Sequence, residues 1–566
     1  MAGTWMTGVV GRSGVRVMLS AAIASVAGMA GTVWAQEHGH DEAALSETTH
    51  EGRLSPFLEG MGNHTYKVTT KDPMAQRFFD QGLVLAYGFN HAEAVRSFQE
   101  AARIDPDCAM AYWGHALVLG PNINAPMGPE AVPEAWEALQ KAIAHKSKVS
   151  QREQDLIDAL ATRYSEDPEA DRAALDVEYM NAMRALHAKY PKDVDIATLA
   201  AESIMDTMPW AYWRRDGRPQ EHTEELIEIL EGVAAADPVH PGAHHYYIHV
   251  VEGSYDPYRG ISSARALDGL VPGAGHLVHM PGHIFLRVGD YDRAAEVNVR
   301  AIAADDGYFT ACRMQGIYPA AYYPHNIHFL WTARQFNGES KAALEAARKT
   351  ASKIHEEMLD VMQQMLLTPL ACMSRFGMWD AILDEPRPSE ERTYLTGYWH
   401  YARGLAFNGI GRPAEARIEL DALRGVISSE QLEPEQVFIH ATPRFLLDLA
   451  ATMLEGEIEL EHGDLDRAIS LYGDAVLMYD TVPYNEPEDW VYPPRHALGA
   501  ALLKAGRAAE AETVYWADLA RHPNNGWALT GLVQALEAQD KDASEVKALL
   551  AEAWDNADVK LKSSRY

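Results

Sequence analysis

Histidine is concentrated in three short stretches of this sequence, "HHYYIHVVEG", "GHLVHMPGH" and "YYPHNIH", which lie between residues 244 and 328. The chain has 24 histidines in 566 residues, so an even distribution would place only about three or four in such a window. Candidate metal ligands in these stretches are His245, His249, Glu252, His276, His279, His283, His325 and His328. Their number favours a functional cluster over isolated core histidines.

Neutral imidazole is a preferred ligand for zinc, copper and iron, and a carboxylate such as Glu252 can complete a mixed ligand shell. Metal–nitrogen bonds are about 2.0–2.1 Å long, whereas packed helices lie about 8–10 Å apart. Side chains from neighbouring helices must therefore share each ion. We expect a mononuclear or dinuclear site for a transition metal (copper, zinc or iron), with His325 and His328 as second ligands or acid–base groups. An open coordination position would let it polarise a substrate or activate water or dioxygen.

The spacing within each stretch fits one face of a helix. Residues at i, i+3 or i+4, and i+7 share a stripe on a helical surface. His245, His249 and Glu252 have this spacing, as do His276, His279 and His283. Pro281 lies inside the second stretch, and proline either kinks a helix or begins one. If a helix begins there, His276 and His279 precede it. We then expect these two residues to lie close to His283, but not on the same helix face.

Aromatic and basic residues beside the histidines suggest a lined cavity. "PWAYWRRDG" and "YYPHN" supply rings and guanidinium groups that suit an anionic or ring-bearing ligand. Packing in the interior between helices is the simpler interpretation of the rings. The candidate ligand-binding residues are Trp210, Trp213, Arg214 and Tyr323. Glu202 and Asp206, spaced i, i+4, are expected on a solvated helix face.

A helix-turn-helix repeat must position these residues. In "FFDQGLVLAYGFNHAEAVRSFQEAARIDP", Gly82 allows close approach of two helices, and Phe98 fills the gap between them. Further copies follow the same spacing, beginning at Gly282, Gly404, Gly456 and Gly499, and a degenerate copy begins near Trp527.

This pattern resembles the tetratricopeptide repeat family over most of residues 73–560. The resemblance implies an all-α superhelix (an α-solenoid) in which the first helix of each repeat lines a concave groove. His276, His279 and His283 match the groove-lining positions of their repeat. The chain is also similar to a group of exported bacterial tetratricopeptide proteins that share the "HLVHMPGHIF" type of segment, a similarity that implies no assigned activity.

The resulting organisation begins with a secretory signal peptide at 1–35, because Arg12 and Arg16 precede an apolar run and "VWA" ends it. A flexible leader is expected at 36–72, a first repeat at 73–120 and irregular helices at 121–240. The histidine-rich region covers 241–350, and a C-terminal repeat array covers 351–566. We expect an exported chain that is soluble after cleavage, and periplasmic in a Gram-negative host.

Composition excludes several function classes. A formal charge of −32 argues against nucleic acid, and the three cysteines form no CxxC or CxxCH motif. P-loop, nucleophile-elbow and dinucleotide-binding patterns are missing from the sequence. The main alternative to a metalloprotein is a non-enzymatic scaffold whose groove binds a protein or peptide, and a pH sensor based on the same histidines is a third. A small molecule or a peptide is the expected partner.

Overall fold

The computed structural model describes residues 52–312, 318–432 and 441–566. Across these ranges the chain is helical, with only isolated β-bridges at 122–125 and 213–219. The all-α prediction is confirmed. The expected signal peptide and residues 36–51 of the expected leader lie outside the described residues, so their interpretation stays a prediction. Within the described part, no helix has both the length and the apolar character needed to cross a membrane.

The N-terminal half begins with helix pairs and continues into the less regular region. Its helices are α2 (Pro73–Tyr87), α3 (His91–Ile104), α4 (Ala109–Val118), α5 (Val132–His145), α6 (Gln151–Ala161), α7 (Arg172–Lys189), α8 (Val194–Asp206) and α9 (Thr223–Ala236). The central helices are α10 (Pro241–Glu252), α11 (Ile261–Leu267), α12 (Gly275–His279), α13 (Pro281–Arg287), α14 (Tyr291–Ala311), α15 (Tyr323–Phe336) and α16 (Ser340–Ser352).

The C-terminal half continues the array. Its helices are α17 (Gln363–Leu366), α18 (Thr368–Arg375), α19 (Trp379–Asp384), α20 (Thr393–Gly409), α21 (Pro413–Ile427), α22 (Pro443–His462), α23 (Leu465–Tyr479), α24 (Arg495–Lys504), α25 (Ala508–Arg521), α26 (Gly526–Glu537) and α27 (Ser544–Ala553). Short helical turns are η2 (Pro129–Ala131), η3 (Lys146–Lys148), η4 (Pro257–Gly260), the π-helical η5 (Tyr318–Tyr322), η6 (Glu356–Met358) and η7 (Glu430–Leu432).

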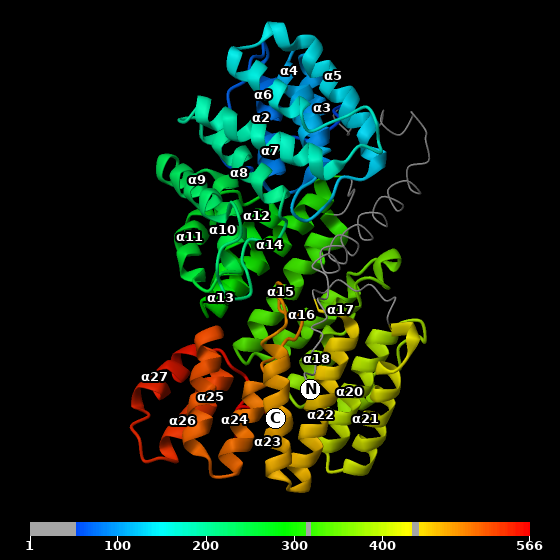
Figure 1. The fold of residues 1–566 in the computed structure, drawn as a ribbon, viewed down its shortest axis with the longest axis vertical. Helices are drawn as coiled ribbons and strands as arrows, with labels where there is room; N and C mark the ends of the chain where they lie inside the picture. The colour runs from blue at the N-terminus through cyan, green and yellow to red at the C-terminus, as the bar shows by residue number, and fades with distance from the viewer. Residues whose placement is uncertain (1–51, 313–317, 433–440) are drawn as a thin grey trace, which may run out of the picture.

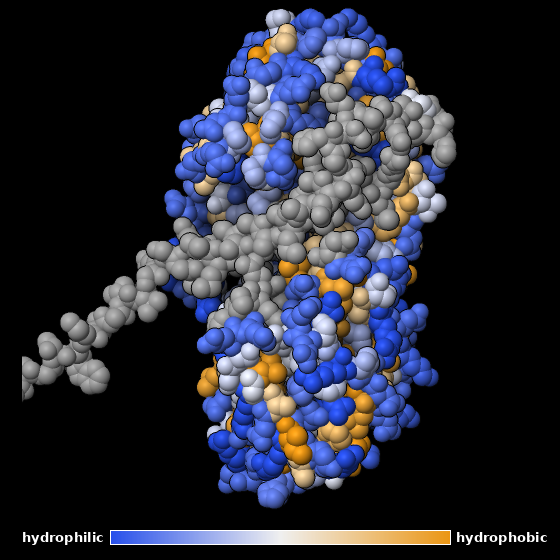
Figure 2. Space-filling model, turned by 90° about the vertical axis from the view of Figure 1, so that its right-hand side faces the viewer, coloured by the Kyte–Doolittle hydropathy of each residue, from blue (hydrophilic) through white to orange (hydrophobic). Residues whose placement is uncertain are grey.

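The molecule is elongated, with consecutive helices packed against one another along its length (Figure 1). Helices α2–α7 form one end and α20–α27 the other, with α10–α15 between them. One large apolar core fills the N-terminal and central helices, and a second fills the C-terminal half. The surface seen in Figure 2 is mostly hydrophilic, with scattered apolar patches.

Close contacts between glycine and aromatic rings explain how the paired helices approach. A methyl group on Gly82 would lie 2.8 Å from the Phe98 ring, and one on Gly456 would lie 2.7 Å from the Tyr472 ring. In each pair the ring comes from the residue 16 positions after the glycine. Such distances leave no space for a side chain at the glycine. The small-residue and aromatic pattern of the sequence is therefore the packing contact between the two helices of a repeat.

Candidate metal centre

The central helices bring the histidine stretches together in the interior. Helix α10 supplies His245, His249 and Glu252, and α15 supplies His325 and His328. The chain is helical again from Gly275, but Pro281 divides this stretch into α12 and α13, because proline has no N–H to continue the hydrogen-bond ladder. His276 and His279 thus precede the helix that carries His283.

Most of these side chains are almost inaccessible. His245 and His279 are 0% exposed and His249 and His276 are 2% exposed. The cluster therefore lies in the interior between α10, α12, α13 and α15, rather than on an open groove as the repeat resemblance implied.

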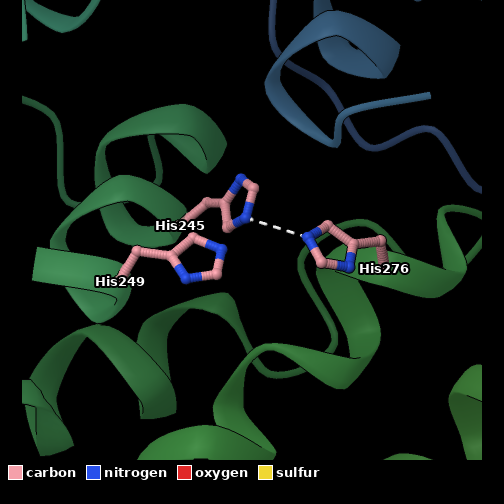
Figure 3. A group of neighbouring side chains, drawn as sticks. All are labelled: His245, His249 and His276. Carbon is pink, nitrogen blue, oxygen red and sulfur yellow. Dashed lines mark hydrogen bonds between the residues drawn. The ribbon is translucent and has the colours of Figure 1, made fainter. Parts of the chain in front are cut away.

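The first group of ligands, here called the first trio, consists of His245, His249 and His276. Each offers a ring nitrogen, and these nitrogens lie within 4.8 Å of one another. The Nε2 atoms of His245 and His276 are 3.1 Å apart. Figure 3 shows the two α10 rings facing the ring of His276 across a small gap.

The second trio consists of His279, His283 and His325, whose ligand atoms also lie within 4.8 Å of one another. The Nε2 atoms of His279 and His283 are only 2.6 Å apart. Two lone pairs at this distance repel, so either a proton or a cation belongs between them. The trios adjoin, because the His249 and His283 ring centroids are 5.6 Å apart and those of His276 and His279 are 5.9 Å apart.

Oxygen acceptors fix the outer nitrogen of four of the six rings. His245 Nδ1 donates to the backbone carbonyl of Tyr87, because a carbonyl oxygen can only accept. His249 Nδ1 contacts Glu252 Oε1 at 2.8 Å, and His283 Nδ1 contacts Glu252 Oε2 at 2.6 Å. With Nδ1 as donor, the neutral rings of His245 and His249 keep the Nε2 lone pair directed into the cluster. His249 Nε2 is buried and has no hydrogen-bond partner.

Asn298 provides the fourth anchor. Its Oδ1 lies 2.6 Å from His279 Nδ1, and its Nδ2 donates to the carbonyl of Ala294, which fixes the orientation of the amide. Outer hydrogen bonds of this kind orient metal-ligating histidines and set their tautomers.

Burial and charge separate the protonation states of the cluster. Burial lowers the pKa of His245, His276 and His279 well below 6.5, so these rings are neutral at pH 7. Burial also opposes protonation of His283, but the negative charge of Glu252 outweighs it and raises the pKa of His283 to about 10. A proton on His283 accounts for its short contact with His279 in the metal-free chain, and a metal ion would displace it.

Two carboxylates complete the centre. His249, Glu252, His283 and Glu486 offer ligand atoms within 4.8 Å of one another. Burial raises the pKa of Glu252, but the charge of His283 outweighs it and holds that pKa well below its usual range. Burial and the charge of Glu252 raise the pKa of Glu486 well above its usual value.

Glu486 reaches the cluster from the segment between α23 and α24, as does Tyr484, whose hydroxyl donates to Glu252 Oε2 at 2.8 Å. Nothing in the sequence pattern marks these two residues. Asn298, by contrast, stands 16 positions after Gly282, where other repeats carry Phe98 or Tyr472. A polar residue at that aromatic position is a signal that sequence analysis could have used.

The other candidate residues lie at different distances from the trios. His328 is buried and stacks on Trp331, with ring centroids 5.3 Å apart, outside both trios. The Trp210 ring contacts the His249 ring edge-on, with the ring centroids 5.1 Å apart. Trp213 donates to the carbonyl of Val250, and Arg214 is exposed.

Tyr323 packs with Ile302 and Ile327 and donates to Asp306 Oδ1. The preceding residue, Tyr322, contacts the His276 ring instead, with the ring centroids 4.7 Å apart.

The expectation of a solvated face for Glu202 and Asp206 is wrong. Both carboxylates are buried on α8, and Asp206 Oδ2 accepts from Arg163 at 2.6 Å. Arg163 arrives from the end of α6, so the i, i+4 spacing alone did not reveal the partner. Asp206 therefore belongs to an ion pair with Arg163, and neither acid is part of the histidine trios.

A fourth group, His64, Asp195 and His240, has the composition of a metal site but is already satisfied. His240 Nδ1 accepts from the backbone N–H of Ala243, which leaves Nε2 as the donor toward Asp195. Asp195 Oδ1 also contacts His64 Nε2 at 2.8 Å and accepts from the Tyr87 hydroxyl at 2.8 Å. These contacts join the N-terminal segment to α2, α8 and α10.

No family model and no curated protein matches the chain. Similar solved structures include the APC/C hetero-tetramer Cut9–Hcn1, at 13% identity and a TM-score of 0.28, covering 85% of this chain and 76% of that one. A human IFIT1 dimer with PPP-AAAA has 10% identity and a TM-score of 0.31, covering 85% and 90%. Yeast Tom70 has 9% identity and a TM-score of 0.26, covering 86% and 93%. At these TM-scores the likeness carries no argument about function.

Proposed function

We propose that this chain is a metalloprotein whose two histidine trios each bind one transition-metal ion. The observation that carries the proposal is the set of anchored rings. His245, His249, His279 and His283 each hold an oxygen acceptor at Nδ1 and direct Nε2 into the cluster. The inward nitrogens of His245 and His279 face another imidazole nitrogen, at 3.1 and 2.6 Å. The buried Nε2 of His249 has no hydrogen-bond partner. A shared cation would satisfy lone pairs whose burial otherwise costs free energy.

The donor set favours zinc, copper or iron. Imidazole nitrogens and carboxylates suit these ions, whereas thiolates are missing from the clusters found among the described residues. Two ions are favoured over one because the trios share no residue and adjoin each other. Glu252 contacts a ring from each trio and is placed to balance the charge of both ions.

A cavity of about 40 Å³ adjoins this centre, and His283, Phe329, Tyr484 and Glu486 are among the residues that line it. A few water molecules fill such a volume. We propose that the centre is reached by molecules of this size, such as water or dioxygen, which an ion with an open coordination position can activate.

Metal content tests the proposal directly. The purified chain is stripped with a chelator, dialysed against zinc, copper or iron in turn, and analysed for bound metal. We expect two ions per chain in the wild type and one in either His249→Ala or His279→Ala, since each substitution breaks one trio. The double variant should bind none. His400→Ala is a matched control, because His400 pairs with Glu419 far from the centre.

Failure to bind any stoichiometric ion would refute the metalloprotein, and one ion in the wild type would refute the second position. Circular dichroism of each variant shows whether it has folded.

We further propose that the chain is exported, on the pattern of residues 1–35. Cell fractionation and N-terminal sequencing of the mature protein test this, with a first residue near Gln36 as the expected result.

A further inference from the structure

A second cavity, of about 290 Å³, lies in the C-terminal half, away from the histidine trios. Residues of α18, α20, α22 and α24 surround it, together with Arg565 and Tyr566. Three rings on its wall belong to Trp379, Tyr401 and Tyr492. None of its lining residues belongs to the metal centre.

Arg375 lines this cavity and is only 6% exposed. Its guanidinium lies 3.6 Å from the centroid of the Trp527 ring and 5.5 Å from that of Tyr492. Among the residues that the structure describes, no carboxylate oxygen lies within 4.0 Å of its nitrogens, and its Nε has no hydrogen-bond partner. Burial lowers the pKa of Arg375 to about 9. Burying a cation without an anion costs free energy, and a bound anion would lower that cost.

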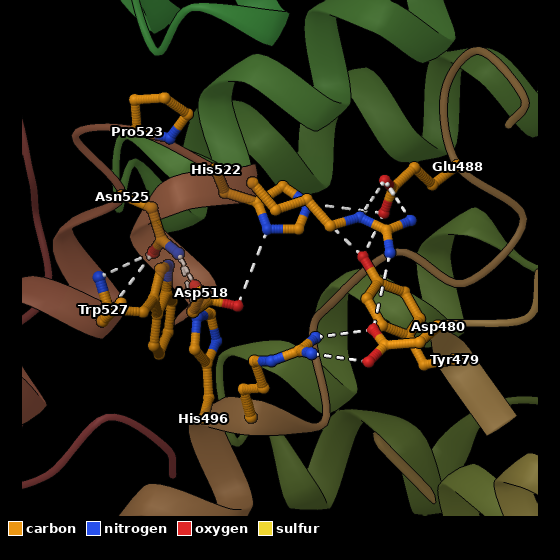
Figure 4. Close-up of polar contacts among 12 residues, drawn as sticks. Tyr479, Asp480, Glu488, His496, Asp518, His522, Pro523, Asn525 and Trp527 are labelled. Atoms are coloured by element: carbon orange, nitrogen blue, oxygen red, sulfur yellow. Dashed lines mark hydrogen bonds and ion pairs between the residues drawn. The ribbon is translucent and has the colours of Figure 1, made fainter. Parts of the chain in front are cut away.

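Within the described ranges, the side chain that hydrogen-bonds to this guanidinium is the neutral ring of His496. Arg375 Nη2 donates to His496 Nδ1 at 2.9 Å, and since arginine can only donate, the proton of His496 is on Nε2. That nitrogen faces Asp518 Oδ2 at 2.9 Å. Figure 4 shows Asp518 between His496, His522 and Asn525. The Asp518 carboxylate therefore interacts with these neighbours, and the His496 ring lies between it and Arg375.

Other polar atoms of the cavity wall also lack partners. Ser374 Oγ and Asn408 Oδ1 are buried and accept or donate no hydrogen bond. The second arginine of the wall, Arg565, is already paired with Glu457, and Glu461 is exposed. The uncompensated positive charge is thus that of Arg375, beside two unsatisfied polar atoms and an aromatic wall.

We propose that this cavity binds a small organic carboxylate, with its carboxylate on Arg375 and its apolar part against Trp379, Tyr401 and Tyr492. Arginine forms paired, charge-assisted hydrogen bonds with carboxylates. A cavity of about 150 Å³ holds a benzene ring, so the volume here accommodates a ring together with its carboxylate and some water. This site is independent of the proposed metal centre.

Calorimetric titration of the full chain tests the proposal, with benzoate as the organic carboxylate and inorganic phosphate as the small anion. We expect saturable benzoate binding at one site per chain, and weaker or no binding of phosphate. Arg375→Met should weaken benzoate binding by roughly tenfold or more, because it removes the charge that the carboxylate pairs with. Arg424→Met is the matched control, since Arg424 is an exposed partner of Glu455 outside the cavity.

Asn408→Asp provides a second variant if Arg375→Met does not fold. It keeps the side-chain size but places a negative charge in the wall, and it should also weaken benzoate binding. The proposal is overturned if wild type does not bind benzoate at millimolar concentration, or if phosphate binds in its place. Unchanged affinity in folded Arg375→Met or Asn408→Asp overturns it as well.

Discussion

Replacing Asn298 with leucine tests how this residue contributes to metal binding, separately from its contribution to helix packing within the repeat. Leucine has the same branching and the same number of side-chain heavy atoms as asparagine, but it cannot accept the hydrogen bond from His279 Nδ1. The ring then loses the partner that fixes its tautomer and direction. Removing such an outer partner typically weakens metal binding by about 10–100-fold, which corresponds to roughly 1.4–2.8 kcal/mol.

Folding stability should change as well. His279 is fully buried, so its Nδ1–H would remain without an acceptor, at a cost of about 1–3 kcal/mol. Asn298→Asp keeps an acceptor for His279 and should retain most of the metal affinity. Competition with a chelator of known affinity measures the dissociation constant, and urea unfolding of the metal-free chain measures stability.

Asn326→Leu is the control for this comparison. Asn326 is equally buried but donates to Asp305, so its loss should lower stability without changing metal affinity. The reasoning is refuted if Asn298→Leu binds metal as tightly as wild type, or if Asn326→Leu loses affinity to the same degree.

Three further predictions concern stability. Burial lowers the pKa of His328 to about 3, so as pH falls below about 6.5 the unfolded chain takes up this proton first. The free energy of unfolding of wild type should therefore fall by about 1.4 kcal/mol per pH unit relative to that of His328→Leu. Urea unfolding at pH 7 to 5 measures both, and an equal pH dependence of the two proteins would contradict this. Gly114→Ala places a methyl group 2.4 Å from the Phe98 ring and should cost about 1–3 kcal/mol. In Gly232→Ala, where the space is open, stability should not fall. Chelation of the metal-loaded chain should lower its thermal midpoint, by the equivalent of about 2.7 kcal/mol at a free metal concentration 100 times the dissociation constant, and an unchanged midpoint would argue against structural metal.

The sequence predicted the helical architecture because its signals are local. Gly82 and Phe98, or Gly456 and Tyr472, stand at fixed separations within one repeat, and the same separations bring them into contact. The pairing of His245 with His249 follows from one helical turn. Convergence of the three histidine stretches was expected from the neighbouring positions of their helices, and the distances within each trio agree with it.

The remaining parts of the site depend on contacts that no local period encodes. Glu486 approaches His283 from a segment about 200 positions further along the chain, and the carbonyl of Tyr87 meets His245 across 158 positions. Asp206 was misjudged for the same reason, because its partner Arg163 belongs to another helix. Spacing indicates which residues share a face, but the identity of the opposing surface comes only from the folded chain.

The contact between Tyr484 and Glu252 spans 232 positions, as does the contact between Tyr291 and the carbonyl of Pro523. In a simple array of repeats each unit touches only its neighbours, and such arrays can unzip from their ends. Here these two hydrogen bonds join the middle of the chain to its last third. Unfolding should consequently be more cooperative than in an open array of this length, because the central helices and those of the last third must separate together.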